Sequence, residues 1–280
     1  MSYPSFIGID IGNSAVKMAL HDGLAWGEPV VWPLPYAYDV PPEEWTEVAA
    51  SFARAVDVRG AAIASVVPAL TPRLEAAVRE GAGLAPAHLS AESPLPFAVR
   101  YGTPGTLGAD RLAAAAGAWH HWAARDGGPP RPVVVIDAGS AITVDVVAPT
   151  PDGPTFLGGA IAPGPDMLRR ALAEGAAQLP EVAWEPPARP IGTTTAEAMQ
   201  AGLTAFVEGG LERLIAQADE ALGQAVRVVA TGGHGRRLAE RLTRVEAYRP
   251  LLVFEGLRVV FGPPRPGDAG QPGGQRSPGA

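Results

Sequence analysis

The strongest constraint on the fold of this chain is a pattern that occurs twice: an apolar strand ends in an aspartate, and a glycine and a serine follow. The first copy is FIGIDIGNSAVKMAL at residues 6–20, and the second is VVVIDAGSAITVDVV at residues 133–147. In each copy a second apolar stretch follows after a short gap, which is typical of a β-hairpin. The repeat predicts an α/β protein with two related domains, in which Asp10 and Asp137 face each other across a cleft.

The length of the chain agrees with two domains, because 280 residues are too many for one small core. A connection rich in glycine and proline, RDGGPPRP at residues 125–132, marks the expected boundary between a domain of residues 1–124 and one of residues 125–261. Residues 262–280 consist mostly of Gly, Pro, Arg, Gln and Ser, so we expect a disordered tail.

Composition excludes several classes of protein. The net charge of −7 argues against a nucleic-acid-binding surface. The chain has no cysteine, which rules out disulfides and cysteine-based zinc sites. The N-terminus lacks the basic and apolar regions of a signal peptide, and no apolar run is long enough for a membrane helix. We therefore expect a cytoplasmic protein without a membrane partner.

Periodicity and turn residues predict the remaining elements. Helices are expected over residues 43–56, 72–78, 108–124, 166–179 and 195–222, the last of them with a break near Gly209 and Gly210. Further strands are expected over residues 61–70, 155–164 and 225–235.

The first copy carries residues that suit a polyphosphate. Gly12 lets a ligand approach the backbone closely, and N–H groups in such a turn can hold phosphate oxygens. Asn13 and Ser14 add neutral donors, Lys17 adds a cation, and the Asp10 carboxylate can hold magnesium directly or through water. The alternative is a plain hairpin turn, in which Asp and Asn occur because they favour turns. The second copy favours the functional interpretation.

Two further segments carry polar residues near helix starts. In TLGADRLAAAAGAW, Asp110 is either the N-cap of the helix or a carboxylate base, with Arg111 beside it for an anionic substrate group. In IGTTTAEAMQAG, Thr194 or Thr195 is an expected N-cap, and the other hydroxyls can donate to a ligand. The glycines of ATGGHG at residues 230–235 are able to lie against a nucleotide.

Together these segments resemble type III pantothenate kinase, a family of the acetate and sugar kinase/Hsp70/actin superfamily, from about residue 6 to residue 260. The segments that carry the resemblance are DIGNSAVK, ASVVPALTPRL, YGTPGTLGADR, DAGSAITVD, GGAIAPG and GTTTAEAMQAG, which occur in the family's order. The resemblance implies two ribonuclease H-like domains with the actin-like ATPase fold.

The resemblance also implies roles for individual residues. The ATP site would consist of Asp10, Ile11, Gly12, Asn13, Ser14, Ala15, Val16 and Lys17, together with Ser140 from the second copy. The pantothenate site would consist of Tyr101, Gly108, Ala109, Asp110, Arg111 and Thr195, with Asp110 as the general base. Asp137 would help to bind a monovalent cation, K⁺ or NH₄⁺, and the protein would be a homodimer whose pantothenate site is completed near the dimer interface.

The sequence departs from the family pattern at a few positions. Thr103 and Thr194 stand where the family has Asn, while Ser14 and Ser140 replace Thr and keep the hydroxyl. By simple alignment of the two copies, Val144 takes the position of Lys17. The first copy is thus expected to hold the polyphosphate, and the second a small cation.

The implied reaction is transfer of the γ-phosphoryl group of ATP to pantothenate, the first step toward coenzyme A, with Mg²⁺ as cofactor. Two alternatives stay open at this point. One is a non-catalytic regulator, since some relatives of the family are accessory factors for gene expression, and the other is a kinase for a different small hydroxyl substrate.

Overall fold

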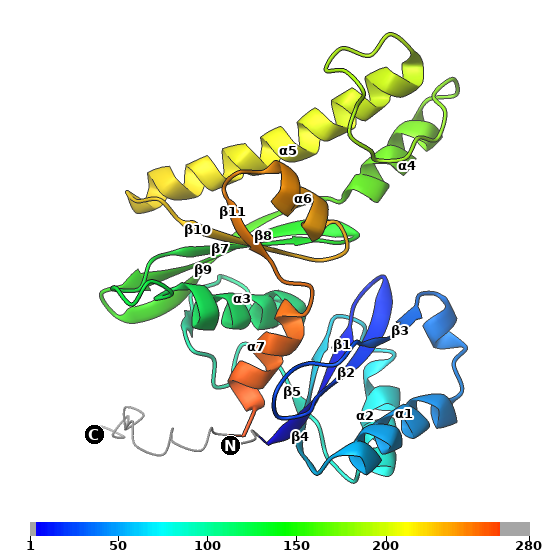
Figure 1. Ribbon diagram of the computed structural model, residues 1–280, viewed down its shortest axis with the longest axis vertical. Helices are drawn as coiled ribbons and strands as arrows, with labels where there is room; N and C mark the ends of the chain where they lie inside the picture. The colour runs from blue at the N-terminus through cyan, green and yellow to red at the C-terminus, as the bar shows by residue number, and fades with distance from the viewer. Residues whose placement is uncertain (1–3, 264–280) are drawn as a thin grey trace.

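The computed structural model of the chain describes residues 4–263, which form two β-sheets with helices on both faces (Figure 1). The first sheet has the order β3-β2-β1-β4-β5, and the second has the order β11-β10-β7-β8-β9-β6. The strands of the first sheet are β1 (Ser5–Ile11), β2 (Ala15–His21), β3 (Val30–Pro33), β4 (Val58–Ser65) and β5 (Ala87–His88). Those of the second are β6 (Ala98–Val99), β7 (Val133–Ala138), β8 (Ala141–Thr150), β9 (Gly153–Pro163), β10 (Arg227–Thr231) and β11 (Val245–Tyr248).

The two sheets share one topology. In each, a central antiparallel hairpin carries a third antiparallel strand on one side and two parallel strands on the other, with β7, β8, β9, β10 and β11 in the places of β1, β2, β3, β4 and β5. The short strand β6 adds to the free side of β9. This confirms two related α/β domains of the ribonuclease H type, each opening with a hairpin.

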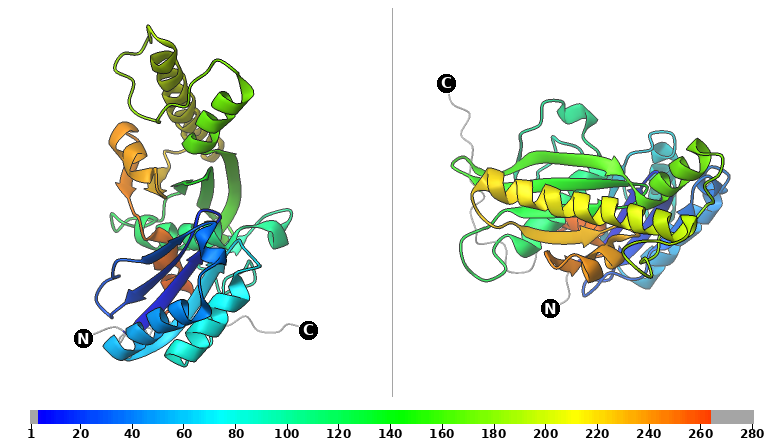
Figure 2. Two further views of the ribbon diagram at one scale, coloured as in Figure 1. Left: turned by 90° about the vertical axis from the view of Figure 1, so that its right-hand side faces the viewer. Right: turned by 90° about the horizontal axis from the view of Figure 1, so that it is seen from above.

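The helices form three layers around the sheets. The helices α1 (Pro42–Ala55) and α2 (Thr71–Ala82) cover the outer face of the first sheet. The outer side of the second sheet carries α4 (Pro165–Gly175), α5 (Thr195–Leu222) and α6 (Gly235–Arg241). Between the sheets lie α3 (Ala109–Trp122) and α7 (Leu252–Phe261), as Figures 1 and 2 show. Two short 3₁₀ turns occur at Tyr36–Tyr38 and Pro104–Thr106.

Alternation along the central strands explains this layering, because neighbouring residues of a strand point to opposite faces. In β1, Ile7 and Ile9 join the cluster beneath α1 and α2, whereas Phe6 joins the cluster around α3 and α7. In β7, Val134 packs toward α5 and Val135 toward α3. Both central strands are therefore apolar on both faces, as the uninterrupted hydrophobic runs in the sequence predict.

The two inner helices pack unusually closely because small residues line their contact. A Cβ atom added to Gly256 of α7 would lie 1.7 Å from the carbonyl oxygen of Ala113 in α3, and one added to Gly117 would lie 2.8 Å from that of Leu252. On the other side of α7, a Cβ on Gly8 of β1 would lie 2.6 Å from the ring of Phe254. The α3–α7 pair thus connects the first sheet to the second with almost no space between the backbones.

The structure corrects some of the predicted elements. The strand expected over residues 61–70 is β4, which ends at Ser65. The helix expected to break near Gly209 and Gly210 is the continuous helix α5. The domain ranges 1–124 and 125–261 stay a prediction, but the contacts cross between them: α3 packs on β7 and β8, and α7 packs on β1 and β4. The tail predicted over residues 262–280 lies, from residue 264 onward, outside the described residues.

Within residues 4–263, the structure contains no helix whose length and hydropathy would suit a membrane span.

The α3–α7 contact gives a first prediction. Gly256→Ala should lower the free energy of unfolding by about 2 kcal/mol, because the new methyl group overlaps the backbone of Ala113. The matched control is Gly209→Ala in the exposed part of α5, where nothing lies within 4 Å of the added Cβ. This control should raise stability by about 0.5–1 kcal/mol. Thermal or urea unfolding of both variants checks the prediction, and equal effects of the two substitutions would contradict it.

Candidate functional site

The turns of the two hairpins meet at the centre of the molecule. The hydroxyl groups of Ser14 and Ser140, which lie 126 residues apart in the sequence, are hydrogen-bonded to each other. The turns are built alike: the N–H of Gly12 donates to the carbonyl of Ala15 at 3.0 Å, and the N–H of Gly139 donates to that of Ala141 at 3.0 Å. The structure therefore brings the two copies of the repeated motif together face to face.

Neither turn needs a glycine for steric reasons. Gly12 and Gly139 are not among the glycines with positive φ, and the nearest atoms to an added Cβ would be 3.6 Å and 3.8 Å away. An alanine would fit at both positions in the absence of a ligand. The physical role left for these glycines is to leave the surface of the turns open, so that a ligand can come close to the backbone.

Asp10 and Lys17 form an ion pair across the first hairpin. They are partners in the β1–β2 register, and the Lys17 Nζ lies 3.2 Å from the Asp10 Oδ2. The carboxylate of Asp10 is buried, whereas the side chain of Lys17 is 40% exposed. The negative charge of Asp10 raises the pKa of Lys17 above its usual value, although burial opposes this. Lys17 is therefore a fixed cation at the edge of the paired turns.

In the second hairpin the partner of Asp137 is Thr143, not the Val144 that alignment of the sequences suggested. The reason is the length of the turn. Gly12 bonds to the third residue after it, whereas Gly139 bonds to the second, so the second turn is one residue shorter and the register moves by one. A threonine hydroxyl thus stands where the first hairpin has an ammonium group, and Asp137 has no cation of its own across the hairpin.

Asp137 is the most perturbed carboxyl group of this cluster. Burial raises the pKa of Asp137 to about 7, and the nearby carboxylates of Asp10 and Asp110 contribute to the increase. Gly232, at the end of β10, has φ of 84°, and a Cβ there would lie 2.4 Å from the Asp137 Oδ1. The backbone of the ATGGHG segment therefore lies directly against this carboxylate. A cation placed here would relieve the repulsion among the three acids.

Asp110 does not cap its helix. The N-cap of α3 is Gly108, without a side-chain cap, and Asp110 lies in the first turn. Its Oδ1 instead accepts a hydrogen bond from the N–H of Arg111 at 2.8 Å. A Cβ on Gly108 would lie only 2.4 Å from this oxygen, so Gly108 makes room for the carboxylate. Burial, together with the charges of Asp10 and Asp145, raises the pKa of Asp110. The capping alternative is therefore wrong.

Arg111 is held by a residue that the sequence interpretation did not select. Its guanidinium donates to the carboxylate of Asp145 in β8, with Nη2 at 2.5 Å from Oδ1. The ring of Tyr101 lies 5.8 Å from the guanidinium carbon. Asp145 was present in the DAGSAITVD segment, but nothing in the sequence distinguished it from an ordinary strand residue.

A pocket of about 440 Å³ adjoins the start of α3. It is lined by the loop of residues 104–108, by Ser65 and Val66 at the end of β4, and by the segment 89–92, which includes Ser90 and Glu92. None of these three polar residues was a candidate in the sequence. The pocket reaches Gly108 and Ala109, and it therefore ends next to the carboxylate of Asp110.

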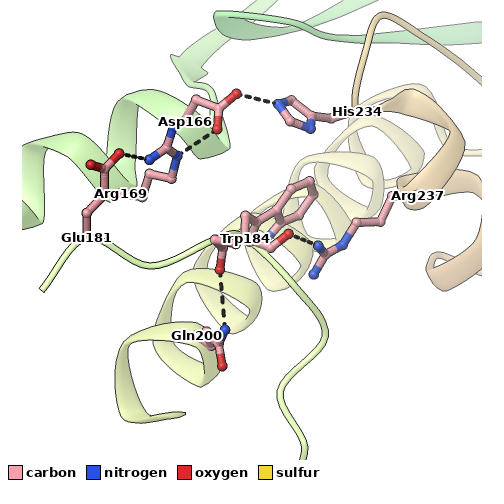
Figure 3. Close-up of polar contacts among 8 residues, drawn as sticks. Asp166, Arg169, Glu181, Trp184, Gln200, His234 and Arg237 are labelled. Atoms are coloured by element: carbon pink, nitrogen blue, oxygen red, sulfur yellow. Dashed lines mark hydrogen bonds and ion pairs between the residues drawn. The ribbon is translucent and has the colours of Figure 1, made fainter. Parts of the chain in front are cut away.

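A second pocket, of about 410 Å³, lies in the second domain between α4, α6 and the segment 181–184. Figure 3 shows its walls: the Asp166 carboxylate lies between Arg169 and His234, and Arg169 also contacts Glu181. Two backbone hydrogen bonds join residues at the edge of this pocket to the second turn. The N–H of His234 donates to Ala138 at 2.9 Å, and that of Gly164, which precedes α4, donates to Ser140 at 3.0 Å.

Thr195 is the predicted site residue that the structure keeps apart from the others. It is the exposed first residue of α5, after the N-cap Thr194, whose hydroxyl accepts from the Glu197 N–H at 3.2 Å. In Figure 1, α5 lies on the far side of the second sheet from α3. The helix that begins at Thr195 and the helix that carries Asp110 thus lie on opposite sides of the second sheet.

Among residues 4–263, no three His, Cys, Asp or Glu side chains are arranged as a ready-made metal site. The oxygen groups at the turns still suit magnesium, since this ion commonly takes only one or two carboxylates and completes its coordination with water and phosphate oxygens. Asp10, two residues before the glycine of the first turn, offers such a carboxylate, and the turns add the hydroxyl groups of Ser14 and Ser140.

A family model described as type III pantothenate kinase matches residues 6–217. The chain belongs to the type III pantothenate kinase family. Among its relatives, the type III pantothenate kinase of Acidiphilium cryptum is 35% identical over 257 residues, which cover 90% of this chain and 92% of that protein. The one of Akkermansia muciniphila is 33% identical over 260 residues, 92% of this chain and 98% of that protein.

Solved structures agree with the fold of this type III pantothenate kinase family member. A chain from Campylobacter jejuni described as a Baf family transcriptional activator aligns with a TM-score of 0.52 and 21% identity, over 90% of this chain and 94% of that one. A glucokinase from an Antarctic psychrotroph aligns with a TM-score of 0.50 and 11% identity, over 92% and 98%. At these identities the likeness shows the fold alone, and the expected actin-like ATPase fold is confirmed.

Asp137 gives a prediction for the pH dependence of stability. Its pKa of about 7 lies above the ordinary value of 3.8, so the folded protein holds a proton that the unfolded chain has lost. The stabilisation is complete below about pH 4 and disappears as the pH rises through 7. Relative to Asp137→Asn, the free energy of unfolding of the ligand-free protein should therefore fall with a slope on the order of 1 kcal/mol per pH unit in this window.

Urea unfolding at several pH values, without nucleotide or potassium, measures this slope. Asp152→Asn is the control, because Asp152 is 84% exposed and should leave the wild-type pH dependence unchanged. Parallel pH curves for the wild type and Asp137→Asn would refute the prediction.

Proposed function

We propose that this protein transfers the γ-phosphoryl group of ATP to pantothenate, with Asp110 as the general base. The observation that carries this proposal is the meeting of the two glycine turns beside the Asp10–Lys17 pair, close enough to Asp110 for the charge of Asp10 to raise the pKa of Asp110. Membership in the type III pantothenate kinase family supports the choice of substrates. The finer assignments below rest on the geometry and on the resemblance of the motifs.

The phosphates of ATP would lie over the first turn. In this proposal Asp10, Ile11, Gly12, Asn13, Ser14, Ala15, Val16 and Lys17 form the phosphate loop, and Ser140 adds a contact from the second turn. The open backbone at Gly12 and the fixed cation Lys17 suit phosphate oxygens, and the nucleoside would extend toward the pocket beside His234. Magnesium, when bound near Asp10, would neutralise part of the phosphate charge.

Pantothenate would enter from the other side, through the pocket that ends at Asp110. Gly108 and Ala109 line this pocket. In this proposal Tyr101 and Arg111 add contacts next to them, and Arg111 offers its guanidinium to the substrate carboxylate or a hydroxyl. The Asp110 carboxylate would accept the proton of the primary hydroxyl. The substrate oxygen would form its bond to the γ-phosphorus while the bond from that phosphorus to ADP breaks. The raised pKa of Asp110 suits a base that works near neutral pH.

We also propose that the enzyme acts in the cytoplasm as a homodimer whose substrate site is completed near the interface. The support is that Thr195, which matches a substrate-contacting threonine, is exposed and lies across the second sheet from Asp110. Large apolar side chains are exposed in the same domain, among them Phe206 at 80% and Ile161 at 64%.

The general base is tested by Asp110→Asn. The variant should bind ATP normally and lose about 10²–10⁴-fold in kcat, because the amide cannot accept the hydroxyl proton. A coupled assay with ATP, pantothenate, magnesium and potassium measures the loss, and circular dichroism confirms the fold. Asp152→Asn serves as the exposed control. Wild-type turnover in Asp110→Asn would exclude this role.

The same assay distinguishes the alternative functions. Across a panel of small hydroxylated acids, pantothenate should give the highest kcat/KM. A better substrate in the panel would point to another kinase, whereas no turnover with any member would point to a non-catalytic regulator.

The monovalent cation site is tested by exchanging the salt. Turnover should require K⁺ or NH₄⁺ and fall by about tenfold or more in Na⁺, because a cation beside Asp137 offsets the repulsion among three carboxylates. Asp137→Asn should show low activity in all salts. Equal activity of the wild type in K⁺ and Na⁺ would rule out this requirement.

A further inference from the structure

Arg111 and Asp145 form a buried ion pair between the start of α3 and the middle of β8. The Arg111 Nε lies 3.0 Å and 3.2 Å from the two carboxylate oxygens, and Nη2 lies 2.5 Å from Oδ1. The two side chains are only 8% and 2% exposed. This is the most fully buried ion pair among the described residues, and it lies one residue away from the proposed base.

Asp145 contacts only one edge of the Arg111 guanidinium. The contacts to Asp145 use Nε and Nη2, so Nη1 lies outside the pair. Tyr101 limits the remaining freedom of the group from the side, because its ring lies 5.8 Å from the guanidinium carbon and itself packs on Phe156. With one edge bound by Asp145 and Tyr101 beside it, the guanidinium is held in place, and Nη1 takes no part in the ion pair with Asp145.

A buried ion pair in this place is poorly explained by stability alone. Removing two charges from water costs free energy that their attraction offsets only with good geometry, and apolar residues of similar volume often do as well. In β8, Val144 directly before Asp145 and Val147 two residues after it are apolar core residues. Asp145 does share its strand face with Thr143, which is the register partner of Asp137. The acid therefore lies on the site-facing side of the strand, at a position where a core residue would have been the simpler choice.

Asp145 also determines which carboxylate forms the ion pair with the Arg111 guanidinium. Asp110 precedes Arg111 in the chain, and its carboxylate accepts from the backbone N–H of Arg111, not from the guanidinium. Because Asp145 binds the guanidinium, Asp110 makes no ion pair with Arg111, and its Oδ2 is left for a substrate hydroxyl.

We propose that Asp145 is a positioning residue for the reaction: it holds Arg111 so that the Nη1 edge faces pantothenate and stays away from Asp110. This inference rests on the proposed function, because it takes the start of α3 as the pantothenate site. Asp145 itself does not touch the substrate. Asp145 orients a single substrate-binding group, Arg111. Loss of the Asp145 carboxylate should therefore weaken the binding of pantothenate and leave the binding of ATP unchanged.

The test compares Asp145→Asn and Asp145→Glu with the wild-type enzyme in steady-state kinetics, varying pantothenate and ATP separately. Asp145→Asn should raise the KM for pantothenate by about tenfold or more, because a misplaced binding group loses most of its benefit. The KM for ATP should stay within about twofold of wild type. Asp145→Glu keeps the charge but moves it by one methylene. Its KM for pantothenate should therefore lie between those of the wild type and Asp145→Asn.

The control is Glu246→Gln, which removes a carboxylate from another buried arginine, Arg227, at 3.1 Å in the same sheet. It should cost stability and leave both KM values unchanged. If Asp145→Asn does not fold, Asp145→Glu decides the question, with an expected increase of about threefold or more in the KM for pantothenate alone.

A wild-type KM for pantothenate in the folded variant overturns the proposal, and so does an equal increase in both KM values, which indicates a merely structural role. The two proposals fail in distinguishable ways. If the wild-type enzyme does not phosphorylate pantothenate, the proposed function fails. If it does, and Asp110→Asn is inactive while the Asp145 variants behave as wild type, only the role of Asp145 fails.

Discussion

The close packing of α3 against α7 is the interaction on which the rest of the structure depends. Gly256 and Gly117 allow the two helices to touch through their backbones, and the pair fills the space between the sheets. Since α7 lies on β1 and β4 and α3 lies on β7 and β8, this contact sets the distance between the two domains. That distance in turn places Ser14 beside Ser140, so a contact among small residues in the interior determines the geometry of the turns.

The charges at those turns are arranged in an unbalanced way. Asp10 has Lys17 and Asp145 has Arg111, but neither Asp110 nor Asp137 has a side-chain cation within hydrogen-bonding distance among the described residues. Burial raises the pKa of both unpaired acids, and Asp10 adds to the effect in each case. Such a cluster is unfavourable, because each carboxylate opposes the ionisation of the others. In the proposed mechanism, a cation near Asp137 and a substrate hydroxyl near Asp110 would relieve the same repulsion.

Local patterns made much of this molecule predictable. The hairpins, the α/β class and the relation between the halves follow from the two apolar runs that end in Asp10 and Asp137, because a strand buried on both faces must be apolar throughout. Details that depend on spacing were less accessible. The alignment of Val144 with Lys17 was wrong, since one residue less in the second turn shifts the register. The capping role considered for Asp110 was also wrong, because Gly108 takes the N-cap position.

The sequence by itself determined that an acid, a glycine and a hydroxyl follow one another at the ends of two apolar strands, since these residues are only a few positions apart in the chain. It also determined the family, through the order of its motifs. Only the tertiary structure decided which groups meet. The pairing of Arg111 with Asp145, the contact of Gly232 with Asp137 and the separation of Thr195 from Asp110 all join or divide segments that are far apart in the chain. Local sequence cannot specify such contacts, because they arise from how the two sheets pack around α3 and α7.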